Sequence, residues 1–236
     1  MIGWMFDVDG VLCDTGCSIT PEFQKWFIEW AQDKIIYLAT GSQREKTIQQ
    51  IGQEIVDMAL ISFNCLGNSI WMHGKETRIN QITLHQDERE WFDDILLNSK
   101  CPIKTGFHID LRPGSINFST VGRNATMNQR LEYKQWDDIY REREQIRLEF
   151  LKQFPRFDVF IGGNTSIDIC LRGANKGQCR ELIPFPEPHD SLYFFGDKCR
   201  PGEIDKPLAD RCYQRGVDRV FEVNGYLDTW NLLKKL

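Results

Sequence analysis

The stretch Phe6-Asp7-Val8-Asp9-Gly10-Val11 places two carboxylates directly after an apolar run at residues 2–6. A short apolar run that ends in acids is typical of a buried strand that presents side chains at its carboxyl end. Side chains two residues apart share a face within a strand, and at the turn that follows both can approach one ion. Gly10 allows the backbone to turn away at this point. The stretch therefore predicts a cation-binding edge at Asp7 and Asp9.

Strands and helices alternate on both sides of this stretch and again near the end of the chain. The predicted strands lie at 2–6, 35–39, 58–63, 191–196 and 217–222. The predicted helices begin at Thr20-Pro21-Glu22, which suits a capped first turn, and cover 43–55, 177–183, 205–214 and 226–235. Such alternation favours an α/β fold with a doubly wound parallel sheet.

The middle of the chain follows a different pattern. A hairpin is predicted from Ser69 to Ile79, then a helix at 87–98, strands at 104–111 and 115–121, a charged helix at 137–153, and strands at 157–161 and 166–171. These elements favour an antiparallel sheet with helices, inserted as an α+β domain into the first fold. We therefore expect a catalytic core at residues 1–80 and 175–236 and a substrate-binding cap at 81–174.

Composition limits the partners. The 236 residues include 29 Lys plus Arg against 34 Asp plus Glu, a net charge of −5, which argues against nucleic acid or a membrane as a partner. The first residues lack a basic, long apolar leader, and the eight cysteines form no CxxC pair, so we expect reduced thiols and a cytoplasmic protein. The segment from Arg112 to Arg156 contains nine basic and six acidic residues, a net charge of +3. This part of the cap therefore remains suited to a small anion.

Three further motifs fall at predicted strand or helix ends. Thr40-Gly41-Ser42 follows the second strand, and its hydroxyl and backbone N–H groups suit a phosphate. Lys176 precedes a helix and can neutralise charge on Asp7 and on that phosphate. The run Phe194-Phe195-Gly196-Asp197-Lys198 delivers another acid, with Asp205 eight residues further on. The four histidines form no cluster and none is predicted to be catalytic: His73, His85, His108 and His189.

The order of these motifs resembles the haloacid dehalogenase superfamily of phosphotransferases. The middle block is similar to the cap of the eukaryotic-type phosphomannomutase family over residues 106–112, 117–123, 127–130 and 161–168, and residues 194–198 with Pro201-Gly202 fit the same family. The resemblance runs almost end to end, and the arginine spacing is its most specific part. It implies a Rossmann-like core with an inserted α/β cap, a Mg²⁺ cofactor and a homodimer paired through the caps.

The resemblance also implies roles for the acids and the lysine of the core. Asp7 matches the nucleophile that becomes an aspartyl-phosphate, and Asp9 matches the general acid/base. Lys176 matches the charge-neutralising lysine. The Mg²⁺ ligands are expected to be Asp7, the backbone carbonyl of Asp9 and Asp197, with Asp205 in support. Phosphoryl transfer needs chiefly positioning and charge stabilisation, which such a set supplies.

In the cap, the resemblance assigns substrate-binding roles. Arg112, Arg123 and Arg130 match arginines that bind the distal phosphate, while Ser166 and Asp168 match residues that contact the sugar or its phosphate. A guanidinium binds phosphate through a planar, two-pronged fork that lysine lacks. Three such groups favour a substrate that carries a second anion, held while the first phosphate reacts.

Three functions remain open from the sequence. The first is a mutase that interconverts mannose 6-phosphate and mannose 1-phosphate through Asp7, activated by a hexose 1,6-bisphosphate, with glucose phosphates as further substrates. The second is a phosphatase of the same superfamily, in which water discharges the aspartyl-phosphate. Gly16 stands where the family usually has an arginine, nine residues after the nucleophile, which weakens the mutase reading. A non-catalytic sugar-phosphate binder is disfavoured because Asp7, Asp9, Lys176 and Asp197 are all present.

Overall fold

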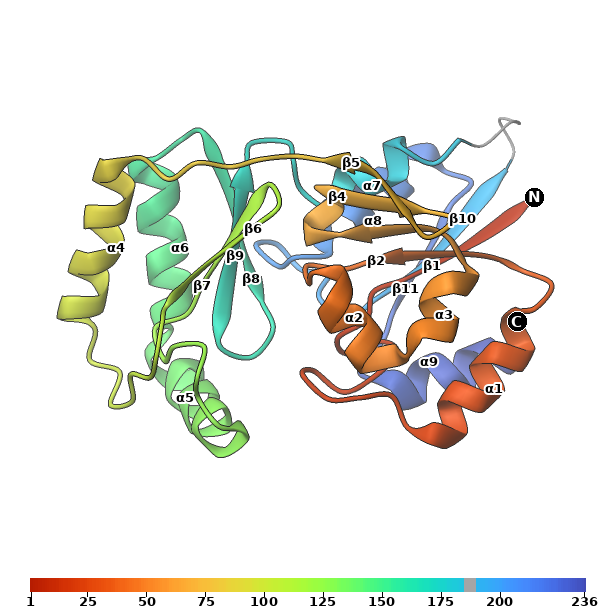
Figure 1. Cartoon of the computed structure of the whole chain (residues 1–236), viewed down its shortest axis with the longest axis horizontal. Helices are drawn as coiled ribbons and strands as arrows, with labels where there is room; N and C mark the ends of the chain where they lie inside the picture. Colours follow the sequence, from red (N-terminus) through yellow and green to blue (C-terminus); the bar gives the residue numbers. More distant parts are fainter. Residues whose placement is uncertain (185–189) are drawn as a thin grey trace. The chain divides into compact units, whose positions relative to one another are not determined.

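The chain, described here by a computed structural model for residues 1–184 and 190–236, forms two compact units. The core unit consists of Met1–Asn80 and Ala174–Leu236, and the inserted unit consists of Gln81–Gly173 (Figure 1). His189 lies outside the described residues. Within the described ranges, no helix is long and apolar enough to cross a membrane.

The core unit is built on one seven-stranded sheet with the order β11-β10-β1-β2-β3-β4-β5. The parallel strands are β11 (Arg219–Glu222), β10 (Ser191–Gly196), β1 (Ile2–Phe6), β2 (Ile35–Ala39) and β3 (Ala59–Asn64). The hairpin β4 (Ser69–Met72) and β5 (Lys75–Ile79) extends the sheet in antiparallel fashion. Because neighbouring parallel strands end at the same edge, the residues that follow β10, β1 and β2 lie side by side, where such sheets bind ligands.

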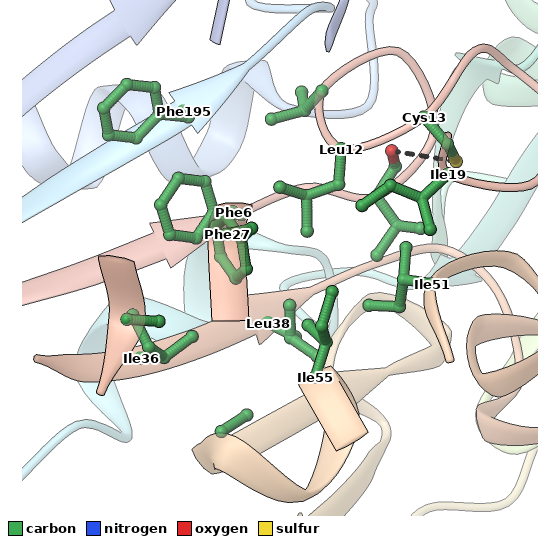
Figure 2. Close-up of a cluster of buried hydrophobic side chains, with 14 of the residues drawn as sticks. Phe6, Leu12, Cys13, Ile19, Phe27, Ile36, Leu38, Ile51, Ile55 and Phe195 are labelled. Carbon is green, nitrogen blue, oxygen red and sulfur yellow. Dashed lines mark hydrogen bonds between the residues drawn. The ribbon is translucent and has the colours of Figure 1, made fainter. Parts of the chain in front are cut away.

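Helices cover both faces of this sheet (Figure 1). One face packs against α1 (Pro21–Ala31), α2 (Arg44–Ile51), α3 (Gln53–Met58) and α9 (Tyr226–Leu233), and Figure 2 shows Phe6, Leu38 and Ile55 in that core. The other face packs against α7 (Gly177–Glu181) and α8 (Lys206–Arg215). The short 3₁₀ turn η1 (Cys65–Gly67) follows β3. Burial on both faces explains why the central strands β1, β2 and β10 are nearly continuous apolar runs, whereas the edge strand β5 is polar and exposed.

The predicted helix over 43–55 is wrong as a single element, because the chain divides it at Gly52. Helix α2 ends there, with the Gly52 N–H donating to the Ile48 carbonyl at 2.8 Å, and α3 begins at Gln53. Gly52 has a φ of 86°, and a Cβ at this position would lie 2.4 Å from Gln24 Nε2. Glycine is the residue that accepts this left-handed backbone without steric cost.

The inserted unit has a four-stranded antiparallel sheet in the order β6-β7-β9-β8. Its strands are β6 (Ile109–Arg112), β7 (Ser115–Phe118), β9 (Ser166–Leu171) and β8 (Phe157–Gly162). Alternate residues such as Ile116 and Ile169 form an apolar face that packs against α4 (Gln86–Asn98) and α6 (Glu142–Gln153). Their neighbours Asn117 and Asp168 face the opposite way, since strand side chains alternate.

The predicted helix over 137–153 is also wrong in extent. The structure has α5 (Met127–Tyr140) followed by α6, separated by Arg141 in the left-handed region with φ 55°. Helix α5 begins at a capping box, in which Thr126 Oγ1 accepts from the Gln129 N–H and the Gln129 side chain accepts from the Thr126 N–H. This Thr-x-x-Gln pattern is a recognisable helix start. Arg130 therefore lies in the first turn of α5.

Candidate active site

Asp7 lies directly after β1 and forms a buried ion pair with Lys176. Lys176 Nζ is 3.0 Å from Asp7 Oδ1 and 2.5 Å from Asp205 Oδ1, and the lysine side chain is 1% exposed. The Val8 N–H also donates to Asp7 Oδ1, at 2.7 Å. A buried ammonium group requires partners because it has lost its water. Lys176 is therefore a fixed counter-charge at the end of β1, as its place before α7 suggested.

A second acid, Asp197, joins Asp7 at the same sheet edge. Asp7, Asp197 and Asp205 each offer an oxygen such that the three atoms lie within 4.8 Å of one another. Both oxygens of Asp205 are engaged, because Oδ1 contacts Lys176 and Oδ2 accepts from the Asp197 and Lys198 N–H groups at 3.2 Å each. Lys198 Nζ contacts Asp197 Oδ2. Asp205 thus positions its neighbours, while Asp7 and Asp197 remain to bind a ligand.

The electrostatics of this cluster fit a divalent cation. Burial raises the pKa of Asp7 to about 8, Lys176 opposes the shift, and Asp205 and Asp197 add to it. Burial also raises the pKa of Asp197 to about 6, against the charge of Lys198. Asp197 Oδ1 is buried and has no hydrogen-bond partner among the described residues. An all-oxygen donor set of crowded acids with one unpartnered atom is what a hard cation such as Mg²⁺ requires.

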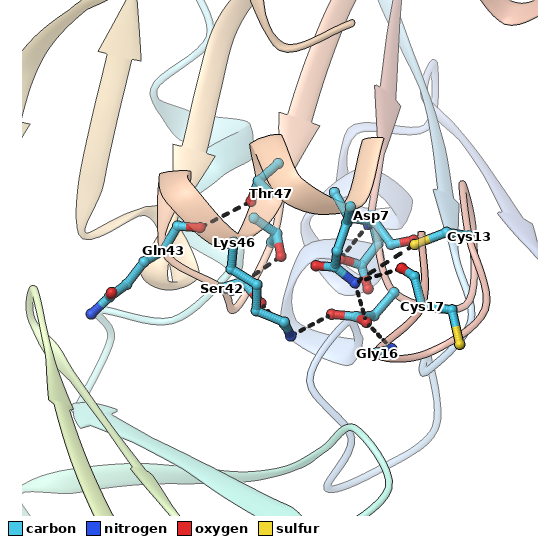
Figure 3. A network of polar contacts seen from close by, with 12 residues as sticks. Asp7, Cys13, Gly16, Cys17, Ser42, Gln43, Lys46 and Thr47 are labelled. Atoms are coloured by element: carbon cyan, nitrogen blue, oxygen red, sulfur yellow. Dashed lines mark hydrogen bonds and ion pairs between the residues drawn. The ribbon is translucent and has the colours of Figure 1, made fainter. Parts of the chain in front are cut away.

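Asp9 has a different environment from Asp7. The Gly16 N–H donates to Asp9 Oδ1 at 2.7 Å, Gln50 Nε2 donates to the same oxygen at 2.8 Å, and Lys46 Nζ lies 3.3 Å from Oδ2 (Figure 3). Burial opposes ionisation of this carboxyl, but the charge of Lys46 and the two hydrogen bonds outweigh it and hold the pKa of Asp9 below its usual value. The side chain is therefore ionised and held from three directions.

Lys46 and Gln50 are site residues that the sequence analysis missed. Lys46 Nζ also donates to Ser42 Oγ at 3.1 Å, so it joins Asp9 to the predicted phosphate-binding turn (Figure 3). Within that turn, the Ser42 N–H donates to Thr40 Oγ1 at 3.1 Å. The sequence did contain one indication of their role. Lys46 and Gln50 are four residues apart on the helix that follows Thr40-Gly41-Ser42, which places both side chains on one helix face.

The predicted cap residues Arg112, Arg123 and Asp168 come together in the inserted unit. Arg112 NH1 lies 3.6 Å from Asp168 Oδ1. Arg112 also donates from Nε to Asp110 Oδ2 at 2.9 Å, and Arg123 NH2 lies 4.0 Å from that same oxygen. Asn117 bridges Arg123 and Asp168 with one hydrogen bond of 2.9 Å to each. Asp110 and Asn117 were not predicted as site residues, although both occur in the stretches on which the resemblance rests.

Arg130 and Ser166 lie next to this group. Arg130 donates from NH2 to the Arg123 carbonyl at 2.8 Å and from NH1 to Thr165 Oγ1 at 3.3 Å. Burial lowers the pKa of Arg123, and the nearby charges of Arg112 and Arg130 lower it further, which is the expected cost of crowding cations. Ser166 is buried at the start of β9, on the same strand face as Asp168. The structure therefore collects all five predicted cap residues in one region of the inserted unit.

Solved structures define the class of fold. The C-terminal domain of trehalose-6-phosphate phosphatase from C. albicans matches with a TM-score of 0.66 at 13% identity, covering 100% of this chain and 92% of that one. A haloacid dehalogenase-like hydrolase from Bacteroides thetaiotaomicron matches with a TM-score of 0.62 at 10% identity, covering 99% and 98%. The chain has the haloacid dehalogenase-like fold, and the predicted fold class is confirmed.

Sequence comparison then gives the family. The family model described as eukaryotic phosphomannomutase matches residues 23–233. A phosphomannomutase from Drosophila melanogaster is 30% identical over 211 residues, covering 85% of this chain and 83% of the relative. A probable phosphomannomutase from Caenorhabditis elegans is 28% identical over 251 residues, covering 98% and 95%. The chain belongs to the eukaryotic phosphomannomutase family, which confirms the resemblance inferred from its motifs.

Proposed function

We propose that this protein is a Mg²⁺-dependent phosphotransferase that interconverts mannose 6-phosphate and mannose 1-phosphate through a phosphorylated Asp7. Family membership supports the reaction class. The observation that carries the proposal is the buried Asp7 carboxylate, paired with Lys176 inside a cluster of oxygen ligands. A strand-end carboxylate with a fixed counter-charge and an acid/base two residues away is the arrangement that nucleophilic phosphoryl transfer needs.

The polar partners of Asp7 indicate which of its oxygens reacts. The Val8 N–H and Lys176 Nζ both approach Oδ1, and none of the described residues forms a hydrogen bond or ion pair with Oδ2. We infer that Oδ2 is the atom that carries the phosphoryl group. When phosphorylated Asp7 meets a hexose monophosphate, the ionised Asp9 takes the proton of a free sugar hydroxyl as that oxygen attacks the phosphorus, and the bond from phosphorus to Oδ2 breaks. In the second half, Oδ2 attacks the other phosphate of the bisphosphate so formed, the bond from that phosphorus to the sugar oxygen breaks, and this oxygen takes the proton back from Asp9.

The metal site is part of the same proposal. Asp7, the backbone carbonyl of Asp9 and Asp197 would hold Mg²⁺, with Asp205 positioning them through Lys176 and the Asp197 N–H. A bound Mg²⁺ supplies positive charge to the phosphoryl group during transfer. Lys176 favours the ionised form of Asp7, and the turn Thr40-Gly41-Ser42 offers donors to the same phosphate.

The second phosphate needs a separate binding group. We assign it to Arg112, Arg123 and Arg130, with Ser166 and Asp168 contacting the sugar. A hexose 1,6-bisphosphate would activate the enzyme by phosphorylating Asp7 before the first turnover.

We further propose that the protein forms a homodimer through the inserted unit, which the resemblance alone supports. We also propose a cytoplasmic location, which the eight free cysteines support.

A phosphatase of the same superfamily is the second candidate, and Gly16 is the observation that favours it. A Cβ at Gly16 would meet no atom within 4 Å, so this position adds neither bulk nor charge beside Asp9. With one cation fewer to retain a bisphosphate, water can discharge Asp7 instead of the sugar. The two functions share the first step and differ in the acceptor.

Incubation with mannose 1-phosphate, Mg²⁺ and a catalytic amount of hexose 1,6-bisphosphate separates these candidates. A mutase forms mannose 6-phosphate in excess of inorganic phosphate. Release of inorganic phosphate without mannose 6-phosphate would overturn the mutase and leave the phosphatase. Asp7→Asn, which keeps the size of the side chain, is the control, because neither product should then form.

A further inference from the structure

We propose that Asn117 is a positioning residue that couples the phosphate-binding guanidinium of Arg123 to the hydroxyl-binding carboxylate of Asp168. This inference rests on the proposed function, because it assigns a ligand that carries both a phosphate and a hydroxyl group. It concerns the inserted unit alone, and neither the family comparison nor the motifs single out Asn117.

Asn117 lies in the middle of the sheet, where its side chain meets both partners. On β7 it pairs with Asp110 of β6 on one side and with Asp168 of β9 on the other. Its Nδ2 donates to Asp168 Oδ1 at 2.9 Å, and its Oδ1 accepts from Arg123 NH1 at 2.9 Å. The residue is 3% exposed. An amide holds its donor and acceptor in one plane, so one buried side chain orients a cation and an anion together.

Asp110 and Arg112 complete a ring of polar contacts that runs from Asn117 through Arg123, Asp110, Arg112 and Asp168 back to Asn117. Arg112 contacts Asp110 Oδ2 through Nε at 2.9 Å and NH2 at 2.8 Å, and its NH1 lies 3.6 Å from Asp168 Oδ1. Arg123 NH2 lies 4.0 Å from the same Asp110 oxygen. Two guanidinium groups repel each other unless acids lie between them. The ring therefore holds both arginines in place before any ligand arrives, which reduces the ordering cost of binding.

The charge balance of the ring predicts the chemistry of the ligand. The ring itself balances two arginines against Asp110 and Asp168, and the neighbouring Arg130 adds one positive charge to this group, which favours an anionic ligand. Asn117 and Arg112 both approach Asp168 at Oδ1, and none of the described residues forms a hydrogen bond or ion pair with Oδ2. That oxygen is available to accept a hydrogen bond from a hydroxyl group. An excess of positive charge beside a carboxylate oxygen that can accept from a hydroxyl group fits a phosphorylated sugar better than a phosphate ester without hydroxyl groups.

The test uses an exchange of the amide and the carboxylate. In Asn117→Asp, the acceptor toward Arg123 is kept, but the donor toward Asp168 is replaced by a second carboxylate. In the double variant Asn117→Asp with Asp168→Asn, the hydrogen bond is restored with its direction reversed, the charge is unchanged, and an amide oxygen can still accept from the ligand. Asn128→Asp, on the exposed surface of α5, is the matched control for added charge in the same unit.

We expect Asn117→Asp to raise the KM for mannose 1-phosphate about tenfold or more, the usual effect of a lost buried hydrogen bond, with a smaller change in kcat. Turnover of p-nitrophenyl phosphate, which lacks hydroxyl groups, should change less than about twofold if binding in the core alone supports it. The double variant should recover most of the lost affinity. The control should match the wild type.

Three outcomes would overturn the inference: an unchanged KM in Asn117→Asp, an equal loss with both substrates, or a double variant weaker than Asn117→Asp. Thermal unfolding of each variant identifies any that fail to fold, and for these Asn117→Ala is measured instead. If the wild type turns over no hexose phosphate, the proposed function fails. Calorimetric binding of mannose 6-phosphate to the Mg²⁺-free full chain then still tests Asn117, with the same order of affinities expected.

Discussion

Asp7 and Asp9 stand two residues apart and have opposite electrostatic environments. Burial and neighbouring acids raise the pKa of Asp7 to about 8, whereas Lys46, Gly16 and Gln50 hold the pKa of Asp9 below its usual value. Carboxyl groups whose environments differ in this way are typical of sites where two acids have two roles. At the residue scale, therefore, Asp7 depends on cations to become ionised, and Asp9 is already ionised by fixed donors.

Gly16 gives a residue-scale prediction about the acceptor of the phosphoryl group. A Cβ there meets no neighbour within 4 Å, although the φ of 78° costs a non-glycine residue about 1 kcal/mol. We expect Gly16→Arg to raise the ratio of mannose 6-phosphate to inorganic phosphate several-fold, because an added guanidinium beside Asp9 retains the phosphorylated intermediate. Gly16→Ala carries the same backbone strain without the charge. If alanine and arginine change the product ratio equally, the missing cation is not what limits the mutase.

The residues that sequence reasoning missed share a physical cause. Lys46 and Gln50 occur within a helix, where a polar residue normally indicates a solvated face, and only the fold turns them toward Asp9. Asn117 and Asp110 occupy strand positions whose partners are set by register. In contrast, Asp7, Lys176 and Asp197 stand at element ends in an order that was sufficient to predict their convergence. Their roles in catalysis remain predictions.

At the scale of elements, the predicted strands and helices differ in how well their bounds match the structure. The strand predicted at 104–111 is wrong in extent, because β6 covers only Ile109–Arg112. Strands β1 and β2 match their predicted ranges because buried parallel strands are short apolar runs between turn residues. The two long predicted helices each break at a positive φ, at Gly52 and at Arg141. Helix α5 was missed because few of its side chains are buried, chiefly Tyr133 and Asp137, so the apolar periodicity is weak.

The junction between α4 and β8 gives a pH prediction. Burial opposes ionisation of Glu88, but hydrogen bonds from Arg156 and from the His85 N–H lower the pKa of Glu88 below its usual 4.5. A lowered folded-state pKa means that this stabilisation is present above pH 4.5 and is lost as the pH falls through the folded value. We expect Glu88→Gln to cost about 1 kcal/mol at pH 7 and less at pH 3.

Urea unfolding of the full chain between pH 3 and pH 7 measures this difference. Glu90→Gln, an exposed neighbour on the same helix, is the control and should follow the wild type at every pH. A difference between Glu88→Gln and the wild type that is the same at both ends of the range would contradict the account, because it would show that the charge of Glu88 contributes nothing.

At the scale of the whole molecule, the net charge of −5 conceals a local excess of positive charge, because the segment from Arg112 to Arg156 carries nine basic and six acidic residues. Within the inserted unit Arg112 and Arg123 lie close together, whereas the core unit gathers acids at one sheet edge. The sheet order β10-β1-β2 brings Asp197 beside Asp7 although 190 residues separate them in the chain. Composition alone excluded a broad polyanion binder, and it was the motif order that predicted a small phosphorylated ligand.

Metal binding should therefore stabilise the folded molecule. A cation that binds only the folded state raises the unfolding temperature with its concentration. We expect Mg²⁺ to raise the melting temperature of the wild type by a few degrees and EDTA to reverse the rise and abolish turnover. Asp197→Asn should remove the rise, and Asp210→Asn, outside the cluster, should keep it. An Asp197→Asn variant that still responds to Mg²⁺ would place the metal elsewhere.

The central claim is that Asp7 carries the phosphoryl group, and trapping that group tests it most directly. The full chain is incubated with Mg²⁺ and a hexose 1,6-bisphosphate, quenched in acid and digested, and the peptide that contains Asp7 is analysed by mass spectrometry. We predict one phosphoryl group on Asp7 in the wild type and none in Asp7→Asn. Continued turnover in Asp7→Asn, or phosphorylation of another residue in the wild type during turnover, would contradict the account.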